Sequence, residues 1–166
     1  MITLINGRGQ LGDKLLQAIE GDNTEKDVRI YHTWNIDDKS KSIQKREYEK
    51  FVNFLKREPE DNKIVFISTN SQKDSWYVYY KHLSEAFLLT NREKCVIIRL
   101  PTLIGKGVFP LLKSGELQPE DFFNLISIDK AVKIILEKTK NNNIVKSFHV
   151  IGETISAESV KNILCL

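Results

Sequence analysis

The sequence predicts a single α/β domain in which about five mostly parallel strands carry helices on both faces. Two observations predict this class. Apolar runs of strand length alternate with amphipathic stretches of helix length along the chain of 166 residues. The first apolar run, residues 2–5, leads directly into a glycine-rich turn and then into a helix pattern. This order is typical of a nucleotide-binding unit on a parallel sheet.

The glycine-rich turn spans residues 6–12, Asn-Gly-Arg-Gly-Gln-Leu-Gly, and a helix over residues 11–19 follows it. The apolar face of that helix consists of Leu11, Leu15, Leu16 and Ile19. Gly9 would let the backbone approach a pyrophosphate, and Gly12 would let the helix pack close to the strand. The candidate cofactor-binding residues of the turn are Gly7, Arg8, Gly9, Gln10, Leu11 and Gly12. The alternative is a tight turn that binds nothing.

The middle of the chain continues the alternation. Residues 28–35 contain a second apolar strand, and residues 41–57 form a helix pattern. The apolar positions of this helix are Ile43, Tyr48, Phe51, Val52 and Leu55. A strand at residues 64–67 ends on two hydroxyl residues, a helix pattern covers residues 72–91, and a strand at residues 95–100 ends at Pro101.

Tyr77 and Lys81 lie four residues apart on the predicted helix, so they share one face, with Glu85 one turn further along. A free tyrosine has a pKa of about 10, and a neighbouring ammonium would lower it toward the range that acid/base catalysis needs. Ser68 or Thr69, at the end of the preceding strand, would hydrogen-bond a substrate oxygen. The alternative is an ordinary amphipathic helix in which Lys81 is solvated. Its buried residues would then be Tyr80, Leu83, Phe87 and Leu88.

This order of strand, hydroxyl, Tyr-x-x-x-Lys helix, strand and a stretch from Pro101 to Gly105 resembles the extended short-chain dehydrogenase/reductases that act on nucleotide sugars, of the dTDP-4-dehydrorhamnose reductase type. The resemblance implies a trimmed, doubly wound Rossmann-like fold. It implies that Tyr77 is the acid/base, that Lys81 tunes it and holds the nicotinamide ribose, and that Pro101 lines the nicotinamide pocket. It also allows a homodimer through helices 41–57 and 72–91.

The resemblance leaves two readings of the glycine turn. Gly7, Gly9 and Gly12 fit G-x-G-x-x-G, whereas the extended family writes G-x-x-G-x-x-G, which places Asn6 at its first glycine. Asn tolerates a positive φ angle better than most residues do. An acid that would hold the adenosine ribose is also hard to find, since Asp37 and Asp38 lie far beyond the turn. Residues 28–35 instead resemble the family's fourth strand, so a strand-helix-strand piece and the adenosine side of the pocket would be missing.

The C-terminal part predicts a short strand at residues 125–128 and a helix over residues 129–136 that Asp129 caps. A last strand at residues 148–152 and a closing helix at residues 155–164, capped by Ser156, follow. The stretch from 106 to 124 is irregular, with a short helix near residues 109–113. We expect one domain over residues 1–166, with a reduced substrate-binding part at about 106–127 and 147–166.

Composition excludes several classes of function. The net charge is +3, from 25 basic and 22 acidic residues that are mixed along the chain, which argues against a nucleic-acid binder. Cys95 and Cys165 do not form a disulfide framework, and the histidines are too scattered for a metal site. No apolar run reaches the roughly 18 residues that span a membrane, so we expect a soluble cytoplasmic protein.

The function that these observations indicate is an NAD(P)-dependent reductase or epimerase acting on a nucleotide-activated sugar. NADP is slightly favoured over NAD because Arg8 lies in the turn and no clear ribose-binding acid follows. The competing class is a non-enzymatic shortened relative that serves as a dimerising or regulatory nucleotide-binding subunit. A third option is a nucleotide-binding module without redox chemistry. The missing piece favours the second class, and the joint presence of hydroxyl, Tyr, Lys and glycine turn favours the first.

Overall fold

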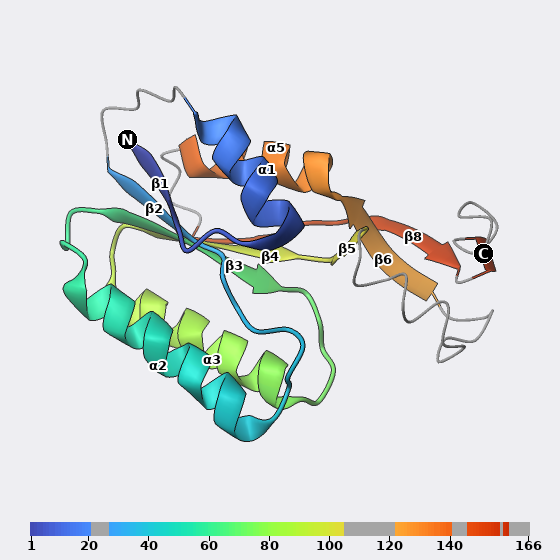
Figure 1. The fold of residues 1–166 in the computed structure, drawn as a ribbon, viewed down its shortest axis with the longest axis horizontal. Helices are drawn as coiled ribbons and strands as arrows, with labels where there is room; N and C mark the ends of the chain where they lie inside the picture. The colour runs from blue at the N-terminus through green and yellow to red at the C-terminus, as the bar shows by residue number, and fades with distance from the viewer. Residues whose placement is uncertain (21–26, 105–121, 141–145, 157, 160–166) are drawn as a thin grey trace.

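The computed structural model describes residues 1–20, 27–104, 122–140, 146–156 and 158–159. Its main sheet has five strands in the order β1-β2-β3-β4-β7, and every neighbouring pair is parallel. These strands are β1 Ile2–Ile5, β2 Val28–Tyr31, β3 Lys63–Thr69, β4 Cys95–Leu100 and β7 Ser147–His149. The predicted parallel sheet is confirmed (Figure 1).

Helices cover both faces of this sheet, as predicted for a doubly wound fold. The helices α1 Gly9–Ile19 and α5 Ile128–Lys140 lie on one face (Figure 1). The helices α2 Lys41–Arg57 and α3 Trp76–Asn91 lie side by side on the other. A separate apolar core forms on each face of the sheet.

The central strand β3 shows why the sequence produces two cores. Its residues Ile64 to Ile67 are all buried, which is the continuous apolar run expected of a strand covered on both faces. Because successive side chains alternate, Ile64 and Phe66 join the core under α2 and α3, whereas Val65 and Ile67 join the core under α1 and α5.

The helices predicted at residues 11–19, 41–57 and 72–91 are present, the first and the third with shifted starts. α2 has the predicted bounds, whereas α3 begins at Trp76 rather than at residue 72. The side chain of Ser75 accepts a hydrogen bond from the Val78 amide at 3.3 Å, so Ser75 is the N-cap that fixes this start. On α1, Leu11 and Leu15 are buried as predicted, but Leu16 is exposed.

A second sheet of three strands adjoins the first, in the order β5-β6-β8. Its strands are β5 Thr102–Ile104, β6 Phe122–Ser127 and β8 Glu153–Ser156. β6 pairs with β5 in parallel and with β8 in antiparallel orientation. The prediction that a helix begins at residue 155 is therefore wrong, because Ile155 pairs with β6. The sequence pattern did not predict β5 or β8.

Smaller corrections concern the ends of these elements. The last strand of the main sheet ends at His149 instead of continuing to residue 152. The cap of α5 is Ser127 rather than Asp129, since the Ser127 hydroxyl accepts from the Lys130 amide at 3.3 Å. The Ser156 hydroxyl accepts from the Ser159 amide at 3.1 Å, as expected of a helix cap. The predicted short helix at 109–113 and the end of the closing helix lie outside the described residues.

The strand order places β2 where the fourth strand of a doubly wound sheet lies. In the complete arrangement the order is 3-2-1-4-5-6, so the second and third strands lie beyond the first. Within the described part of this chain, β1 is an edge strand that pairs only with β2. This is the order expected if a strand-helix-strand piece is missing after α1.

Candidate functional site

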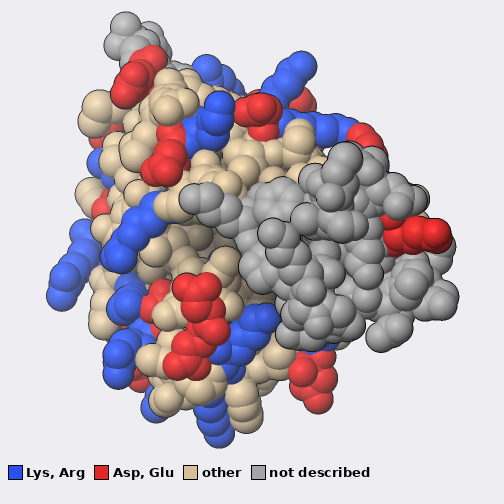
Figure 2. All heavy atoms as spheres, turned by 45° about the vertical axis from the view of Figure 1, so that its right-hand side comes forward, with Lys and Arg blue, Asp and Glu red and all other residues tan. Residues whose placement is uncertain are grey.

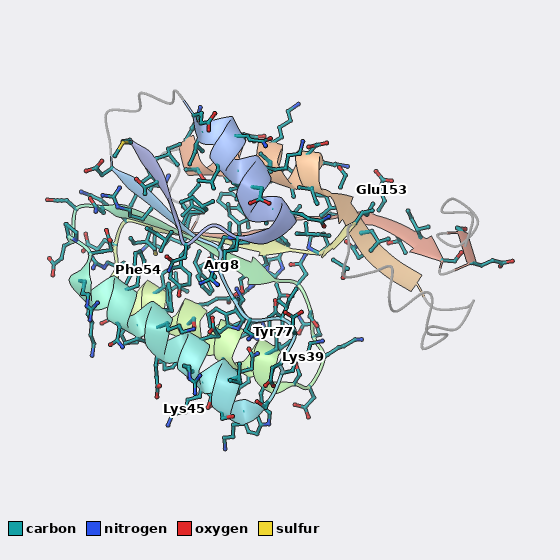
Figure 3. All side chains as sticks on the ribbon, viewed as in Figure 1. Arg8, Lys39, Lys45, Phe54, Tyr77 and Glu153 are labelled. Atoms are coloured by element: carbon teal, nitrogen blue, oxygen red, sulfur yellow. The ribbon has the colours of Figure 1, made fainter. Side chains whose placement is uncertain are left out.

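The predicted site residues meet at one edge of the main sheet. The glycine turn follows β1, His32 to Trp34 follow β2, and Thr69 ends β3. Because these strands are parallel, their carboxyl ends lie at the same edge, where ligands of open α/β sheets bind. The first half of α3, with Tyr77 and Lys81, packs beside this edge (Figure 3).

The backbone of the glycine turn selects one of the two readings of its sequence. Asn6 has a φ angle of 50° and Gly9 a φ angle of 72°. No other described glycine has a positive φ angle, so Gly7 needs none. Asn6 thus occupies the first glycine position of G-x-x-G-x-x-G, with Gly9 as the second. The extended form of the motif is the one that the chain adopts.

Gly12 and Gly9 are required for different reasons. A Cβ atom on Gly12 would lie 2.9 Å from the backbone of Gly7 and 3.1 Å from His32, so only glycine lets α1 pack this close. A Cβ atom on Gly9 would meet nothing within 4 Å. The turn is therefore open at Gly9, at the start of α1, and a helix start that is open in this way fits a pyrophosphate.

The residues that follow β2 stabilise the glycine turn through hydrogen bonds to its backbone. The Thr33 hydroxyl donates to the backbone oxygens of Ile5, at 3.2 Å, and of Asn6. Burial and the nearby Lys81 ammonium lower the pKa of His32 to about 4, so His32 is neutral at neutral pH. Its Nδ1 atom is buried without a hydrogen-bond partner among the described residues.

Of the two candidate hydroxyls, Thr69 rather than Ser68 accompanies Tyr77. Burial raises the pKa of Tyr77, and the neighbouring Thr69 side chain acts in the opposite direction. Thr69 also accepts from the Ser71 amide at 3.1 Å, which fixes its position. Ser68 is buried, and its hydroxyl has no partner among the described residues. Tyr77 is therefore a neutral phenol at neutral pH.

Lys81 is not solvated, contrary to the ordinary-helix interpretation. It is only 3% exposed, and its amine donates to the Ile67 carbonyl at 2.8 Å. The amine also lies 4.4 Å from the ring centre of Trp34 and 4.7 Å from that of Phe66. Burial lowers the Lys81 pKa to about 7, against the opposing charges of Glu85 and Glu47.

Trp34 covers Lys81, a contact that the sequence pattern did not indicate. The Trp34 indole nitrogen donates to Gln44 at 2.7 Å, and Gln44 in turn donates to the Asn35 carbonyl at 3.0 Å. Gln44 is fully buried, so water does not compete for these two hydrogen bonds. A ligand could contact the Lys81 amine only after a covering side chain such as Trp34 moved. The sequence does contain one signal of this contact, because Gln44 is a polar residue among the apolar positions of α2.

Further along the edge, an ion pair joins α3 to β4. Arg99 donates from Nε to both carboxylate oxygens of Glu85, at 3.0 and 3.1 Å, and its Nη1 atom contacts His149 at 2.5 Å. Glu85, which shares the face of Tyr77 and Lys81, thereby has its charge compensated. Pro101 follows β4 directly and is buried.

The two acids considered for the ribose lie away from the glycine turn, in the loop before α2. The backbone amides of Asp37 and Asp38 donate to the Asn35 side chain at 3.0 and 2.9 Å. Asp38 accepts from the Ser40 amide at 2.8 Å, which holds its pKa below the ordinary value. Their contacts are those of a structured turn.

Within the described ranges, no His, Cys, Asp and Glu side chains gather into a group that could hold a metal ion, and no helix could cross a membrane. On the face that Figure 2 shows, basic and acidic side chains are interspersed, with no large patch of one sign.

Solved structures with the same arrangement include several reductases. A dTDP-4-dehydrorhamnose reductase from Clostridium acetobutylicum superposes with a TM-score of 0.77 at 16% identity, over 99% of this chain and 80% of that chain. The chain therefore shares the fold of a nucleotide-sugar reductase. The Bordetella bronchiseptica enzyme WbmG, in complex with NAD and UDP, gives a TM-score of 0.73 at 13% identity, over 98% of this chain and 76% of its own.

A third example is the dTDP-4-dehydrorhamnose reductase from Bacillus anthracis in complex with NADP. It has a TM-score of 0.70 at 12% identity, over 99% of this chain and 81% of that one. No protein-family model matches the sequence, and no curated protein matches it. The resemblance predicted from the sequence is thus confirmed at the level of the fold.

Proposed function

We propose that this protein is an NAD(P)-dependent reductase or epimerase that acts on a nucleotide-activated sugar. The observation that carries the proposal is that Thr69 and Tyr77 lie next to each other at the carboxyl edge of the sheet, beside an open glycine turn. The similar solved structures include proteins bound to NAD, to NADP and to UDP, which supports this class of ligand.

The residues of this chain would divide the work as follows. The start of α1 and the turn at Gly9 would hold the pyrophosphate. The nicotinamide, when bound, supplies or accepts the hydride, because no side chain can do so. Thr69 would hydrogen-bond the substrate oxygen. Tyr77, whose raised pKa keeps it protonated, would donate its proton to that oxygen during reduction.

The position of Lys81 favours a second candidate, a non-enzymatic relative that keeps the fold as a dimerising or regulatory nucleotide-binding subunit. The amine is used within the protein, by the Ile67 carbonyl and the Trp34 ring. In this second candidate Lys81 stabilises the packing of α3, and no ligand reaches it. In the enzyme, Trp34 must move when the cofactor binds.

Tyr77→Phe separates these two candidates. The change removes one oxygen and keeps the ring, so stability should change little, whereas proton transfer should fall by about 10²- to 10⁴-fold. Reduction of nucleotide-activated 4-keto sugars with NADPH or NADH measures this. Tyr79→Phe is the matched control, because Tyr79 lies on the same helix and is 54% exposed. Equal turnover by the two variants, or no nicotinamide binding by the unaltered protein, would rule out the enzyme.

A further inference from the structure

A groove lies between the glycine turn and α2, on the side of the sheet away from α1. Its volume is about 510 Å³, within the range of small-molecule sites. We call it the α2 groove. Its walls include Asn6 and Arg8 from the turn, Tyr31 from β2, and Lys50, Phe54 and Arg57 from α2. Figure 3 shows Arg8 and Phe54 between the sheet and α2.

The free charge of the α2 groove is positive. Its two acids are already compensated, since Glu47 pairs with Lys50 at 2.6 Å and Glu58 pairs with Arg29 at 3.2 Å. By contrast, Arg8 and Arg57 are exposed and take part in no hydrogen bond or ion pair within the part of the chain that the structure describes. Two arginines from opposite walls are therefore available to an anion, and guanidinium groups suit phosphate in particular.

The position of the groove relative to Thr69 and Tyr77 indicates which end of a dinucleotide it would bind. The groove adjoins β1 and β2, at the open edge of the sheet, whereas Thr69 and Tyr77 lie at the end of β3. The glycine turn, through Asn6 and Arg8, forms part of the groove wall. A dinucleotide whose pyrophosphate rests on the turn, with its nicotinamide near Tyr77, would extend its adenosine end toward the groove.

We propose that the α2 groove binds the adenosine phosphate end of the cofactor, with Arg8 and Arg57 on its phosphate monoester and Phe54 beside the apolar part of the nucleoside. This inference rests on the proposed function. It assigns NADP rather than NAD as the preferred cofactor, because only NADP carries a phosphate monoester on its adenosine ribose. It also gives α2 a role in binding, in a chain where β1 has no further strand beside it among the described residues.

Calorimetric titrations of Arg57→Gln test this proposal. The titrants are NADP⁺, NAD⁺, adenosine 2′,5′-bisphosphate and 5′-AMP. Arg57→Gln should weaken NADP⁺ and the bisphosphate about 10-fold, which corresponds to about 1.4 kcal/mol, and should leave NAD⁺ and 5′-AMP within about 2-fold. Lys56→Gln is the matched control, since it removes a charge from the same last turn of α2 outside the groove. Circular dichroism confirms that both variants fold.

The outcomes distinguish the groove from the proposed function. If NADP⁺ binds Arg57→Gln as well as it binds the unaltered protein, the groove assignment is wrong and the proposed function stands. If the bisphosphate alone binds, and does so through Arg57, the groove is a nucleotide site and the dinucleotide function is wrong. If no titrant binds the unaltered protein, both are wrong. Equal weakening by Lys56→Gln would show general electrostatic attraction and also overturn the assignment.

Discussion

The spacing of Lys81 from Tyr77 predicted its position on the helix, but not that its side chain is buried. Its place one turn after Tyr77 is set by the sequence, but its amine lies among Ile67, Trp34 and Phe66. Burial of the charged form costs free energy, which is why its pKa falls to about 7. The expected effect of Lys81 on Tyr77, a lowered pKa, is not what the structure shows, since burial raises the Tyr77 pKa.

The lowered Lys81 pKa predicts a pH-dependent stability. Between its folded value of about 7 and its ordinary value of 10.5, the unfolded chain binds more protons than the folded chain does. The free energy of unfolding should therefore rise with pH, by up to about 1.4 kcal/mol per unit. Denaturant unfolding from about pH 7 to about pH 8 measures this below the ordinary pKa of cysteine.

Two variants isolate the contribution of Lys81 to that slope. Lys81→Met should remove most of the rise, whereas Lys45→Met, at an exposed position of α2, should retain it. Above this range the slope should flatten as the cysteine of the unfolded chain titrates, and reverse above about pH 10, because burial raises the pKa values of Cys95, Tyr31 and Tyr77 and the unfolded chain loses those protons first. A free energy of unfolding that does not change with pH in the unaltered protein would show that the Lys81 amine is solvated.

At the scale of elements, α2 and α3 form one layer that both buries the lysine and carries aromatic surface. Tyr48 of α2 packs against Tyr80 and Phe87 of α3. On the outer side of α3, Trp76 is 42% exposed and Tyr79 is 54% exposed, and their rings contact each other edge-on at 5.8 Å. These exposed rings are available for a contact between two copies.

The resemblance of the sequence predicts that two copies pair through this layer with two-fold symmetry. Sedimentation equilibrium should then give a dimer mass, and Tyr79→Glu should shift it toward the monomer because a carboxylate opposite its own copy is costly. Lys45→Glu, a charge change of the same kind on α2, serves as a control for nonspecific charge effects. A monomer mass at high protein concentration would remove the dimer and leave the fold as described.

At the scale of the whole molecule, the path of the chain supports a missing segment. The crossovers β1-α1-β2 and β2-α2-β3 step in the same direction across the sheet, yet α1 and α2 lie on opposite faces (Figure 1). The two crossovers therefore have opposite hands, although parallel crossovers are almost always right-handed. In the complete doubly wound order, α1 would lead to a strand beyond β1. Loss of a strand-helix-strand piece explains the reversed hand.

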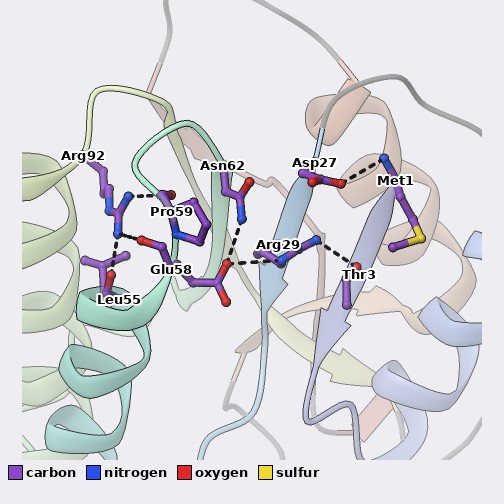
Figure 4. A network of polar contacts seen from close by, with 9 residues as sticks. All are labelled: Met1, Thr3, Asp27, Arg29, Leu55, Glu58, Pro59, Asn62 and Arg92. Carbon is purple, nitrogen blue, oxygen red and sulfur yellow. Dashed lines mark hydrogen bonds and ion pairs between the residues drawn. The ribbon is translucent and has the colours of Figure 1, made fainter.

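Polar side chains form a hydrogen-bonded network beside the edge strand β1. Arg29 of β2 donates to the Thr3 hydroxyl at 3.0 Å and to Glu58 at 3.2 Å, and Glu58 also accepts from Asn62 at 2.9 Å (Figure 4). Beside them, Arg92 donates to the Pro59 carbonyl at 2.8 Å. A helix that covered β1 on this side would require apolar residues here. The network instead pairs the polar groups of this largely buried face with one another.

Arg29→Met tests how much this network contributes. Both side chains of the Arg29–Glu58 pair are less than one-fifth exposed, at 19% and 18%, so the change should lower the free energy of unfolding by about 1–3 kcal/mol. Lys94→Met breaks an equally simple pair with the exposed Asp61 and should have little effect. Urea unfolding of both variants gives the comparison. Equal effects would mean that the network is no more than a surface ion pair.

The sequence by itself determined the elements whose signals are local. The strands at residues 2–5, 64–67 and 95–100 and the helix at residues 41–57 follow from apolar period and end signals, and they were predicted close to their observed bounds. The gathering of the glycine turn, Thr69 and Tyr77 at one edge also follows, because parallel strands share their carboxyl ends. The alternation of strands and helices predicted the helices on both faces, whereas the place of β2 as a fourth strand was implied by the resemblance.

Only the tertiary structure decided what depends on partners distant in sequence. β5 and β8 exist through their pairing with β6, and Ile155 is in a strand for that reason. The sequence of α3 did not indicate which face of the helix is buried, since apolar residues occur around much of the helix. Packing against β3 then turned Lys81 inward under Trp34, which comes from a different strand end. The α2 groove likewise requires walls from the turn and from α2, which no local pattern brings together.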